Sequence, residues 1–144
     1  MVRKVALIAG GMGGIGRAIS KKLAVEGFRV VILYKNISDK EEAMSFASSL
    51  AGGGHTALPC DVTDHAAVDR AIQSVIEEYE RIDVCVYSVS DALVRKKILA
   101  LDAAALKTQF DATVFGGFNI IASVAPIMQR QHKGRIVAIY KVKI

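Results

Sequence analysis

The chain has 144 residues, a length typical of one domain, and its 52% hydrophobic content suits a sheet covered by helices on both faces. We recognise no 18-residue apolar stretch and no signal peptide, so the sequence predicts neither a membrane span nor a cleaved leader. The net charge of +5 arises after Asp111, where five basic and no acidic residues follow, but no nucleic-acid-binding motif accompanies them.

Strand-like and helix-like segments alternate along the chain. Aliphatic and β-branched runs predict strands over 2–9, 28–34, 55–60, 82–89 and 134–144. Helices are predicted over 15–26, from the capping-box pair Ser38 and Glu41 to about Leu50, from a cap at Asp64 through apolar positions 68, 72, 75 and 76, and over 102–131. This alternation predicts an α/β fold, a Rossmann-type doubly wound parallel sheet of five strands ordered 3-2-1-4-5, in one domain over 1–144.

Five glycines lie within residues 10–16, between the first predicted strand and the first predicted helix. They fit two spacings at once, G-x-G-x-x-G and G-x-x-x-G-x-G. A glycine-rich turn before a helix lets a pyrophosphate approach the backbone and the helix N-terminus. A tight turn without a ligand is the alternative. The candidate phosphate-binding residues are Gly10, Gly11, Met12, Gly14, Ile15 and Gly16.

The two cysteines, Cys60 and Cys85, and the three dispersed histidines share no metal-ligand spacing, so no metal site is predicted. Both cysteines are expected to be small buried hydrophobes in a reducing, cytoplasmic compartment. In the predicted strand order two strands separate them, so no disulfide is expected between them.

The second glycine spacing resembles the loop of the short-chain dehydrogenase/reductase family, T-G-x-x-x-G-[IL]-G, with Ala9 in place of the threonine. CDVTD at 60–64 is similar to the family's D-V-[TS]-D, and GRIVAI at 134–139 to its G-R-I-V-N-I. The resemblance covers essentially the whole chain and is closest to the 3-oxoacyl-acyl-carrier-protein reductase branch. It implies that Asp61 holds the adenine amino group of a dinucleotide, a loop-capping aspartate being the alternative. Further cofactor contacts are implied at Val62, Ser88, Val89 and Ser90.

The residues after the second predicted strand bear on which dinucleotide binds. NAD-binding relatives place an acid near the end of that strand to hold the ribose hydroxyls. Here Lys35 and Asn36 follow the strand, and no carboxylate precedes Asp39. Lys35 is a candidate partner for a 2′-phosphate, so NADP(H) is favoured over NAD(H). A solvated surface lysine is the alternative.

The catalytic positions depart from the family pattern. The fourth strand usually ends in N-N-A-G, where this chain reads Y-S-V-S at 87–90. The family's helix asparagine falls at Thr113, whose hydroxyl cannot replace both the donor and the acceptor of an amide. The catalytic serine falls at Lys141, and none of the four tyrosines has a lysine four residues later. The resemblance therefore implies that the chain ends before the Tyr-x-x-x-Lys site and the family's C-terminal strands and helices, and no catalytic residue is assigned.

These patterns favour a domain that binds NADP(H), and the 144-residue chain by itself is not expected to turn over a substrate. An NADPH-dependent 3-oxoacyl or carbonyl reductase, completed by a longer natural chain or a partner, is one alternative. A structural or assembly subunit without nucleotide is another. A methyltransferase is disfavoured because its ribose-binding acid is missing near 34–36. The expected partners are a dinucleotide and a second copy of the chain, in a homodimer or higher oligomer, with no nucleic acid and no membrane.

Overall fold

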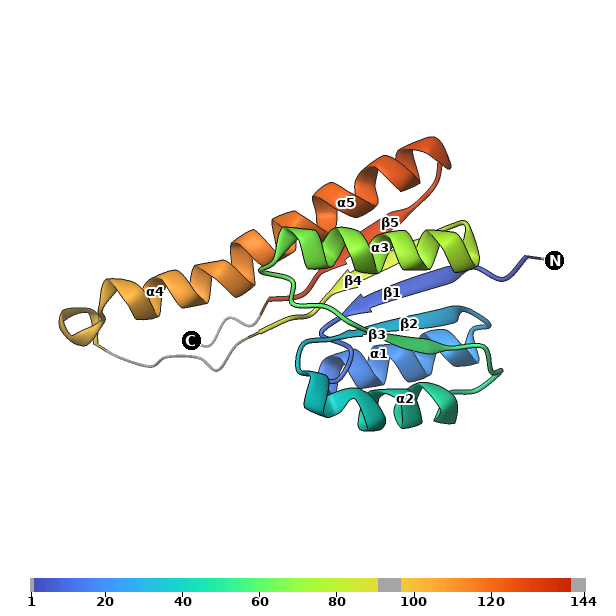
Figure 1. Cartoon of the computed structure of the whole chain (residues 1–144), viewed down its shortest axis with the longest axis horizontal. Helices are drawn as coiled ribbons and strands as arrows, with labels where there is room; N and C mark the ends of the chain where they lie inside the picture. Colours follow the sequence, from blue (N-terminus) through green and yellow to red (C-terminus); the bar gives the residue numbers. More distant parts are fainter. Residues whose placement is uncertain (1, 91–96, 141–144) are drawn as a thin grey trace.

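The computed structural model of the chain describes residues 2–90 and 97–140, which form a parallel sheet between helices (Figure 1). The sheet order is β3-β2-β1-β4-β5, and every neighbouring pair is parallel. The predicted doubly wound fold and strand order are confirmed. Lys141, predicted at the serine position, lies outside the described residues. The strands are β1 (Val5–Ala9), β2 (Arg29–Tyr34), β3 (Thr56–Pro59), β4 (Val84–Tyr87) and β5 (Arg135–Ala138).

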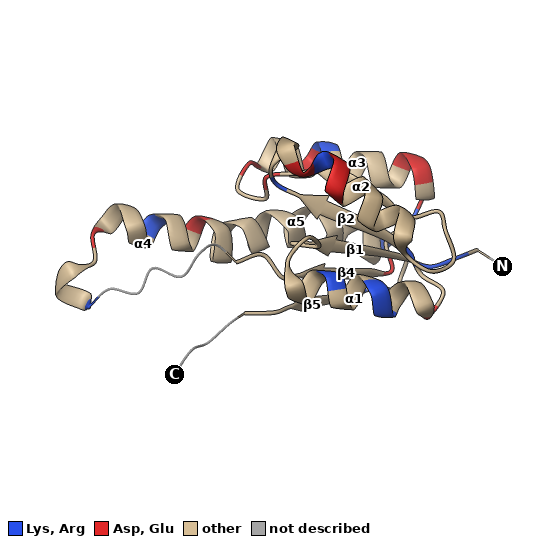
Figure 2. Ribbon diagram, turned by 90° about the horizontal axis from the view of Figure 1, so that it is seen from below, with Lys and Arg blue, Asp and Glu red and all other residues tan. Residues whose placement is uncertain are grey.

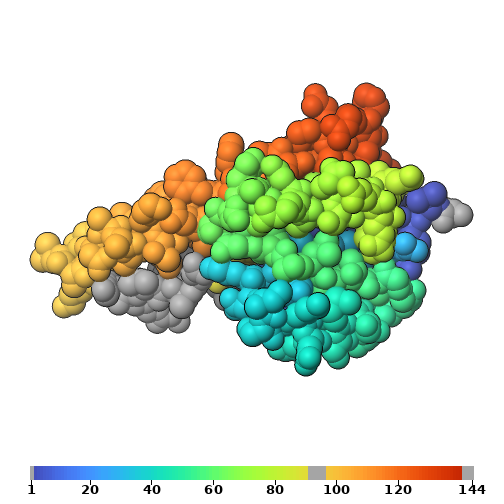
Figure 3. All heavy atoms as spheres, in the orientation of Figure 1, coloured from blue at the N-terminus to red at the C-terminus, as the bar shows by residue number. Residues whose placement is uncertain are grey.

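Two helices cover each face of the sheet. α1 (Gly14–Val25) and α2 (Lys40–Ser49) share a core with one face, and α3 (His65–Tyr79) and α5 (Gly116–Arg130) share a core with the other. α4 (Ala103–Phe110) joins α5 through the π-helical turn η3 (Asp111–Phe115) and extends beyond the sheet (Figure 3). Two 3-10 turns complete the described elements, η1 (Ile37–Asp39) and η2 (Ile98–Ala100).

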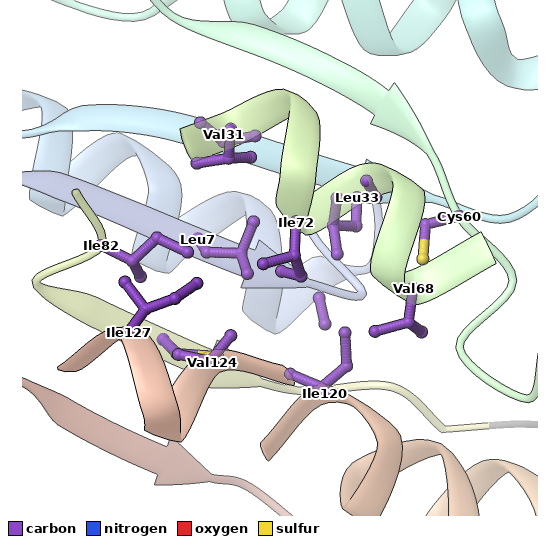
Figure 4. Close-up of a cluster of buried hydrophobic side chains, with 14 of the residues drawn as sticks. Leu7, Val31, Leu33, Cys60, Val68, Ile72, Ile82, Ile120, Val124 and Ile127 are labelled. Atoms are coloured by element: carbon purple, nitrogen blue, oxygen red, sulfur yellow. The ribbon is translucent and has the colours of Figure 1, made fainter. Parts of the chain in front are cut away.

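The central strand β1 is buried on both faces, which explains why its sequence is a continuous apolar run rather than an alternating one. Leu7 faces the α3 and α5 layer, whereas Ala6 and Ile8 face α1 and α2. In Figure 4, Ile72 of α3 and Val124 of α5 lie in the same core as Leu7 of this strand.

Two predicted helix starts had different outcomes. Asp64 caps α3 as expected, because its carboxylate accepts hydrogen bonds from the backbone N–H groups of Ala66 (3.0 Å) and Ala67 (3.3 Å). The predicted capping box at Ser38 and Glu41 is wrong. Residues 37–39 form the 3-10 turn η1, so α2 begins at Lys40, and the Ser38 hydroxyl lies 3.3 Å from Asp39 instead of capping the helix.

The long predicted helix over 102–131 consists of α4, η3 and α5. Its continuous span, Ala103–Arg130, has 28 residues and a mean hydropathy of 1.4 in its most apolar part, of which 33% is buried. Since no charged residue lies between Asp111 and Arg130, this segment meets the length and composition of a membrane span, contrary to the sequence expectation. Its α5 half nevertheless packs in the core: Ile120 and Val124 are fully buried. Figure 2 shows how few charges the helix carries.

Arg3 ties together two loops at the amino end of the sheet. Its guanidinium donates hydrogen bonds to the carbonyl oxygens of Gly27 (3.1 Å) and Phe28 (3.0 Å) after α1. It also donates to Gly52 (3.1 Å) and Gly53 (2.8 Å) after α2. The planar fork of arginine suits this arrangement of several carbonyl acceptors, which a single ammonium group does not match.

We expect Arg3→Met to lower the free energy of unfolding by about 1–2 kcal/mol, because the hydrogen bonds to a charged donor are lost at a partly solvated position. Urea denaturation followed by circular dichroism measures the change. Lys21→Met, on the exposed side of α1, is the control and should leave stability within about 0.5 kcal/mol. Equal stability of the Arg3 and Lys21 variants would contradict the role of Arg3.

Candidate functional site

A cleft of about 300 Å³ opens at the carboxyl ends of the four strands β1 to β4. Ligand clefts of doubly wound sheets lie at this edge. The structure brings nine of the residues selected from the sequence into its lining: Gly10, Met12, Lys35, Asn36, Asp61, Val62, Ser88, Val89 and Ser90. The four other selected residues, Gly11, Gly14, Ile15 and Gly16, belong to the same loop and to the start of α1 but do not line this cleft.

Two glycines of the loop, Gly10 and Gly16, are required by close packing against other backbone atoms. Gly10 has a φ of +76°, and a Cβ there would lie 2.8 Å from the backbone of Ser88. A Cβ at Gly16 would lie 2.2 Å from the carbonyl oxygen of Gly10. Gly14 differs, because a Cβ there would meet no atom of the described residues within 4 Å apart from its chain neighbours and the backbone of its own helix. Packing within this part of the chain therefore does not explain the missing side chain at Gly14.

The N-terminus of α1 offers unpaired backbone donors next to the cleft. Its N-cap residue, Gly13, has no side chain, and no side-chain cap bonds this end among the described residues. Residues 14–17 contain no acid. The N–H groups of a first helical turn have no partner within the helix, and the helix dipole is positive there. The geometry therefore suits an anionic group such as a phosphate.

The end of β2 brings a lysine and a carboxylate into the cleft. The Lys35 Nζ lies 3.9 Å from Asp61 Oδ2, with 56% of the lysine side chain exposed. Asp39 also lines the cleft, where its carboxylate accepts a hydrogen bond from the Asn36 amide (3.2 Å). From the sequence, Asp39 is expected to lie beyond the residues that contact the ribose. The η1 turn brings it back, and Asp39 is therefore a cleft residue that the sequence did not reveal.

Asp61 closes the loop after β3. Its Oδ1 accepts hydrogen bonds from the Thr63 backbone N–H (3.0 Å) and hydroxyl (2.7 Å). Partial burial would raise the pKa of Asp61, but the two Thr63 hydrogen bonds and the nearby Lys35 charge outweigh it and hold the pKa below its usual value. The carboxylate is thus ionised at neutral pH. Asp61 thus caps this loop through Oδ1, and Oδ2, on the Lys35 side, makes no hydrogen bond among the described residues, so both interpretations of Asp61 stay open.

The end of β4 is built around Tyr87, which is fully buried. Its hydroxyl donates a hydrogen bond to the carbonyl oxygen of Ala112 in the η3 turn. Gly116 leaves room for the ring, since a Cβ there would lie 2.6 Å from the tyrosine hydroxyl oxygen. Thr113, at the family's asparagine position, lies in the same turn and does not line the cleft. The end of β4 is therefore filled by a tyrosine that is fixed to the η3 turn.

Cys60 lines the cleft as a buried thiol. Burial raises the pKa of its thiol to about 12, with Asp61 and Asp64 adding to the shift, so the thiol stays protonated at neutral pH. Cys85 is buried on β4, and burial raises its pKa to about 12 as well. Both are free thiols. Within the described residues no group of three or more histidine, cysteine or acidic side chains is arranged to hold a metal ion.

A model of the family described as short chain dehydrogenase matches residues 4–142. The chain belongs to this family. The 3-oxoacyl-[acyl-carrier-protein] reductase FabG of Staphylococcus epidermidis is 31% identical to it over 140 residues, covering 94% of this chain and 55% of the reductase. The resemblance inferred from the glycine loop and the CDVTD segment is thereby confirmed.

Solved structures of other short-chain dehydrogenases superpose on the chain. NAD⁺-bound xylitol dehydrogenase is 26% identical with a TM-score of 0.86, over 94% of this chain and 52% of that one. NADPH-dependent 3-quinuclidinone reductase from Rhodotorula rubra is 25% identical with a TM-score of 0.83, over 95% of this chain and 52% of that one. The chain spans about half the length of the curated relatives it matches.

Proposed function

We propose that this short-chain dehydrogenase domain binds NADP(H) in the cleft at the carboxyl edge of its sheet. The observation that carries the proposal is Gly14, which lacks a side chain without a packing reason, at the uncapped start of α1. A diphosphate on the loop and on this helix end accounts for both features. The adenine then lies toward Val62, with its amino group donating to the Asp61 carboxylate.

The 2′-phosphate preference is part of the proposal. Lys35 is the cation at the end of β2, and an exposed ion pair with a phosphate favours NADPH over NADH. Asp39 opposes this preference, but its carboxylate already accepts hydrogen bonds from Asn36 and Ser38. Among the relatives, one solved structure holds NAD⁺ and another is named NADPH-dependent, so both ligand types occur in the family.

We expect NADPH to bind about fivefold more tightly than NADH, the size of one exposed ion pair, and Lys35→Met to remove the difference. Gly14→Val should abolish detectable binding because its side chain occupies the diphosphate position, while the open space there preserves folding. Isothermal titration calorimetry and thermal unfolding measure the two effects. Equal affinities or tighter NADH binding would refute the preference. Failure of both dinucleotides to bind would favour the alternative, a structural or assembly subunit.

We further propose that the 144-residue chain does not itself reduce a carbonyl. Bound NADPH would supply a hydride, but a proton donor is also needed, and no tyrosine in the sequence has a lysine four residues later. Thr113 replaces the family's helix asparagine, and Tyr87 takes part of the space at the end of β4. The relatives are about twice as long as this chain. The second candidate function is therefore a reductase whose site is completed by further chain or by a partner.

The purified 144-residue chain should oxidise NADPH in the presence of 3-oxoacyl thioesters at no more than the rate measured without protein. Absorbance at the NADPH band follows the reaction, with a full-length relative as the positive control. A rate proportional to the concentration of this chain would overturn the proposal that it lacks turnover.

The partner we propose is a second copy of the same chain, in the cytoplasm. The α4–α5 helix exposes large apolar side chains along its length, among them Leu106 (45% exposed), Phe110 (48%), Phe115 (55%) and Phe118 (65%). Exposed apolar surface of this extent marks a contact surface. The helical spacing of apolar residues predicts Val124 in this surface as well, and that prediction is wrong because Val124 is fully buried against the sheet.

Light scattering at micromolar concentration should give a mass above that of the 15.4 kDa monomer. Phe118→Lys should shift the protein toward monomer, because it places a charge in the exposed apolar face. Val25→Lys, a change at an equally exposed apolar residue of α1, is the control and should leave the mass unchanged. A monomeric wild-type chain would contradict the proposed dimer.

A further inference from the structure

The backbone of the glycine loop has carbonyl groups that need hydrogen-bond donors, in addition to N–H groups that can bind a ligand. If its N–H groups face a diphosphate, its carbonyl groups turn the other way and need donors within the protein. The carbonyl oxygen of Gly10 accepts from the Gly13 N–H (3.1 Å). The carbonyl oxygen of Met12 accepts from a side chain, the Nε of Arg17, at 2.9 Å. A guanidinium therefore fixes the direction of one peptide group in the loop.

Arg17 is itself held in place by α2. Its guanidinium carbon lies 4.8 Å from the centre of the Phe46 ring, which is a cation–π arrangement. Its Nη2 pairs with the carboxylate of Glu42 on the same helix. The arginine side chain is 31% exposed and does not line the cleft formed by the described residues. These contacts connect the loop to α2 without touching the ligand site.

We propose that Arg17 is a positioning residue of the dinucleotide site, and that its contacts with Glu42 and Phe46 hold it in the required orientation. Arg17 holds the Met12 carbonyl away from the diphosphate position, which leaves the loop and the first turn of α1 presenting N–H groups there. The inference rests on the proposed function, because it assigns a role toward the diphosphate of the same ligand. It also gives α2 a role in binding through Glu42 and Phe46, neither of which lines the cleft formed by the described residues.

A positive charge near the loop would also attract a diphosphate directly, and the Glu42→Gln variant separates the two explanations. If Arg17 acts only through its charge, removing the neighbouring acid strengthens the positive field and tightens NADPH binding. If Arg17 acts by orienting the loop, removing the Glu42 charge makes the Arg17 side chain more mobile. NADPH binding then weakens by about two- to fivefold, the size expected for an exposed ion pair. Glu41→Gln removes the same charge one residue away and is the matched control.

The experiment measures the dissociation constants of NADPH and of adenosine 2′-phosphate, which lacks the diphosphate, for the wild type and the three variants. For Arg17→Met we expect about a tenfold loss of NADPH affinity and no change for adenosine 2′-phosphate. For Glu42→Gln we expect weaker NADPH binding, and for Glu41→Gln an unchanged or slightly tighter value. Tighter binding by Glu42→Gln, or an equal loss of both ligands in Arg17→Met, would overturn the inference.

Hydrogen exchange of the ligand-free protein separates this inference from the proposed function. Arg17→Met should accelerate amide exchange over residues 10–16 while leaving β1 and β2 protected, because the loop loses one fixed peptide group. Unchanged exchange in the loop would overturn the positioning role even if NADPH binds. A wild type that binds no dinucleotide, together with accelerated loop exchange in the variant, would contradict the proposed function and retain the role of Arg17 in the loop.

Discussion

The close approach of two strand ends shapes the whole carboxyl edge of the sheet. Where the chain leaves β1, the backbone of Gly10 passes against that of Ser88 at the end of β4, with no room for a Cβ between them. The chain turns there at a positive φ, and Gly16 then brings α1 back onto the carbonyl of Gly10. The start of α1 is therefore fixed beside the cleft by packing of the backbone on itself, before any ligand is considered.

The amino end of the sheet and the start of α1 differ in how their backbone groups are bonded. At the amino end, side chains satisfy them: the Asp83 carboxylate accepts from the Val5 N–H (2.9 Å) and is paired with Arg81 (2.6 Å), and the Gln131 amide bonds both backbone groups of Ile82. Burial alone would raise the pKa of Asp83, but these hydrogen bonds and the Arg81 charge hold it low, so the carboxylate stays ionised. At the carboxyl end, no side chain of residues 2–90 or 97–140 caps the start of α1. The N–H groups of the first turn of α1 therefore remain donors that a ligand can use.

The sequence predicts this fold well where the signal is local or periodic. The strand order follows from alternation and crossover rules, and Asp64 was identified as a cap because its partners are two and three residues away. The predicted cap at Ser38 is wrong because polar residues such as serine and aspartate are common both in 3-10 turns and at the starts of α-helices. The sequence alone does not show that residues 37–39 form a 3-10 turn before α2. Asp39 was missed in the cleft for the same reason.

Contacts between distant segments lay beyond sequence reasoning. The hydroxyl of Tyr87 reaches Ala112 only because η3 brings that carbonyl over the end of β4, and no spacing in the sequence indicates it. Likewise, the helical period does not distinguish Val124 from the exposed apolar residues of the long helix, and only its packing against the sheet does so.

The π turn η3 changes the phase of that long helix. In an unbroken α-helix, Leu106 and Ile120 would be two heptads apart and would face nearly the same direction. A π turn holds one additional residue, and each residue of an α-helix advances the direction by about 100°. The apolar stripe of α4 is thereby rotated away from the stripe with which α5 meets the sheet. The α5 half of this continuous helix can then pack on the core of its own chain, while the α4 half presents its apolar side chains in a different direction.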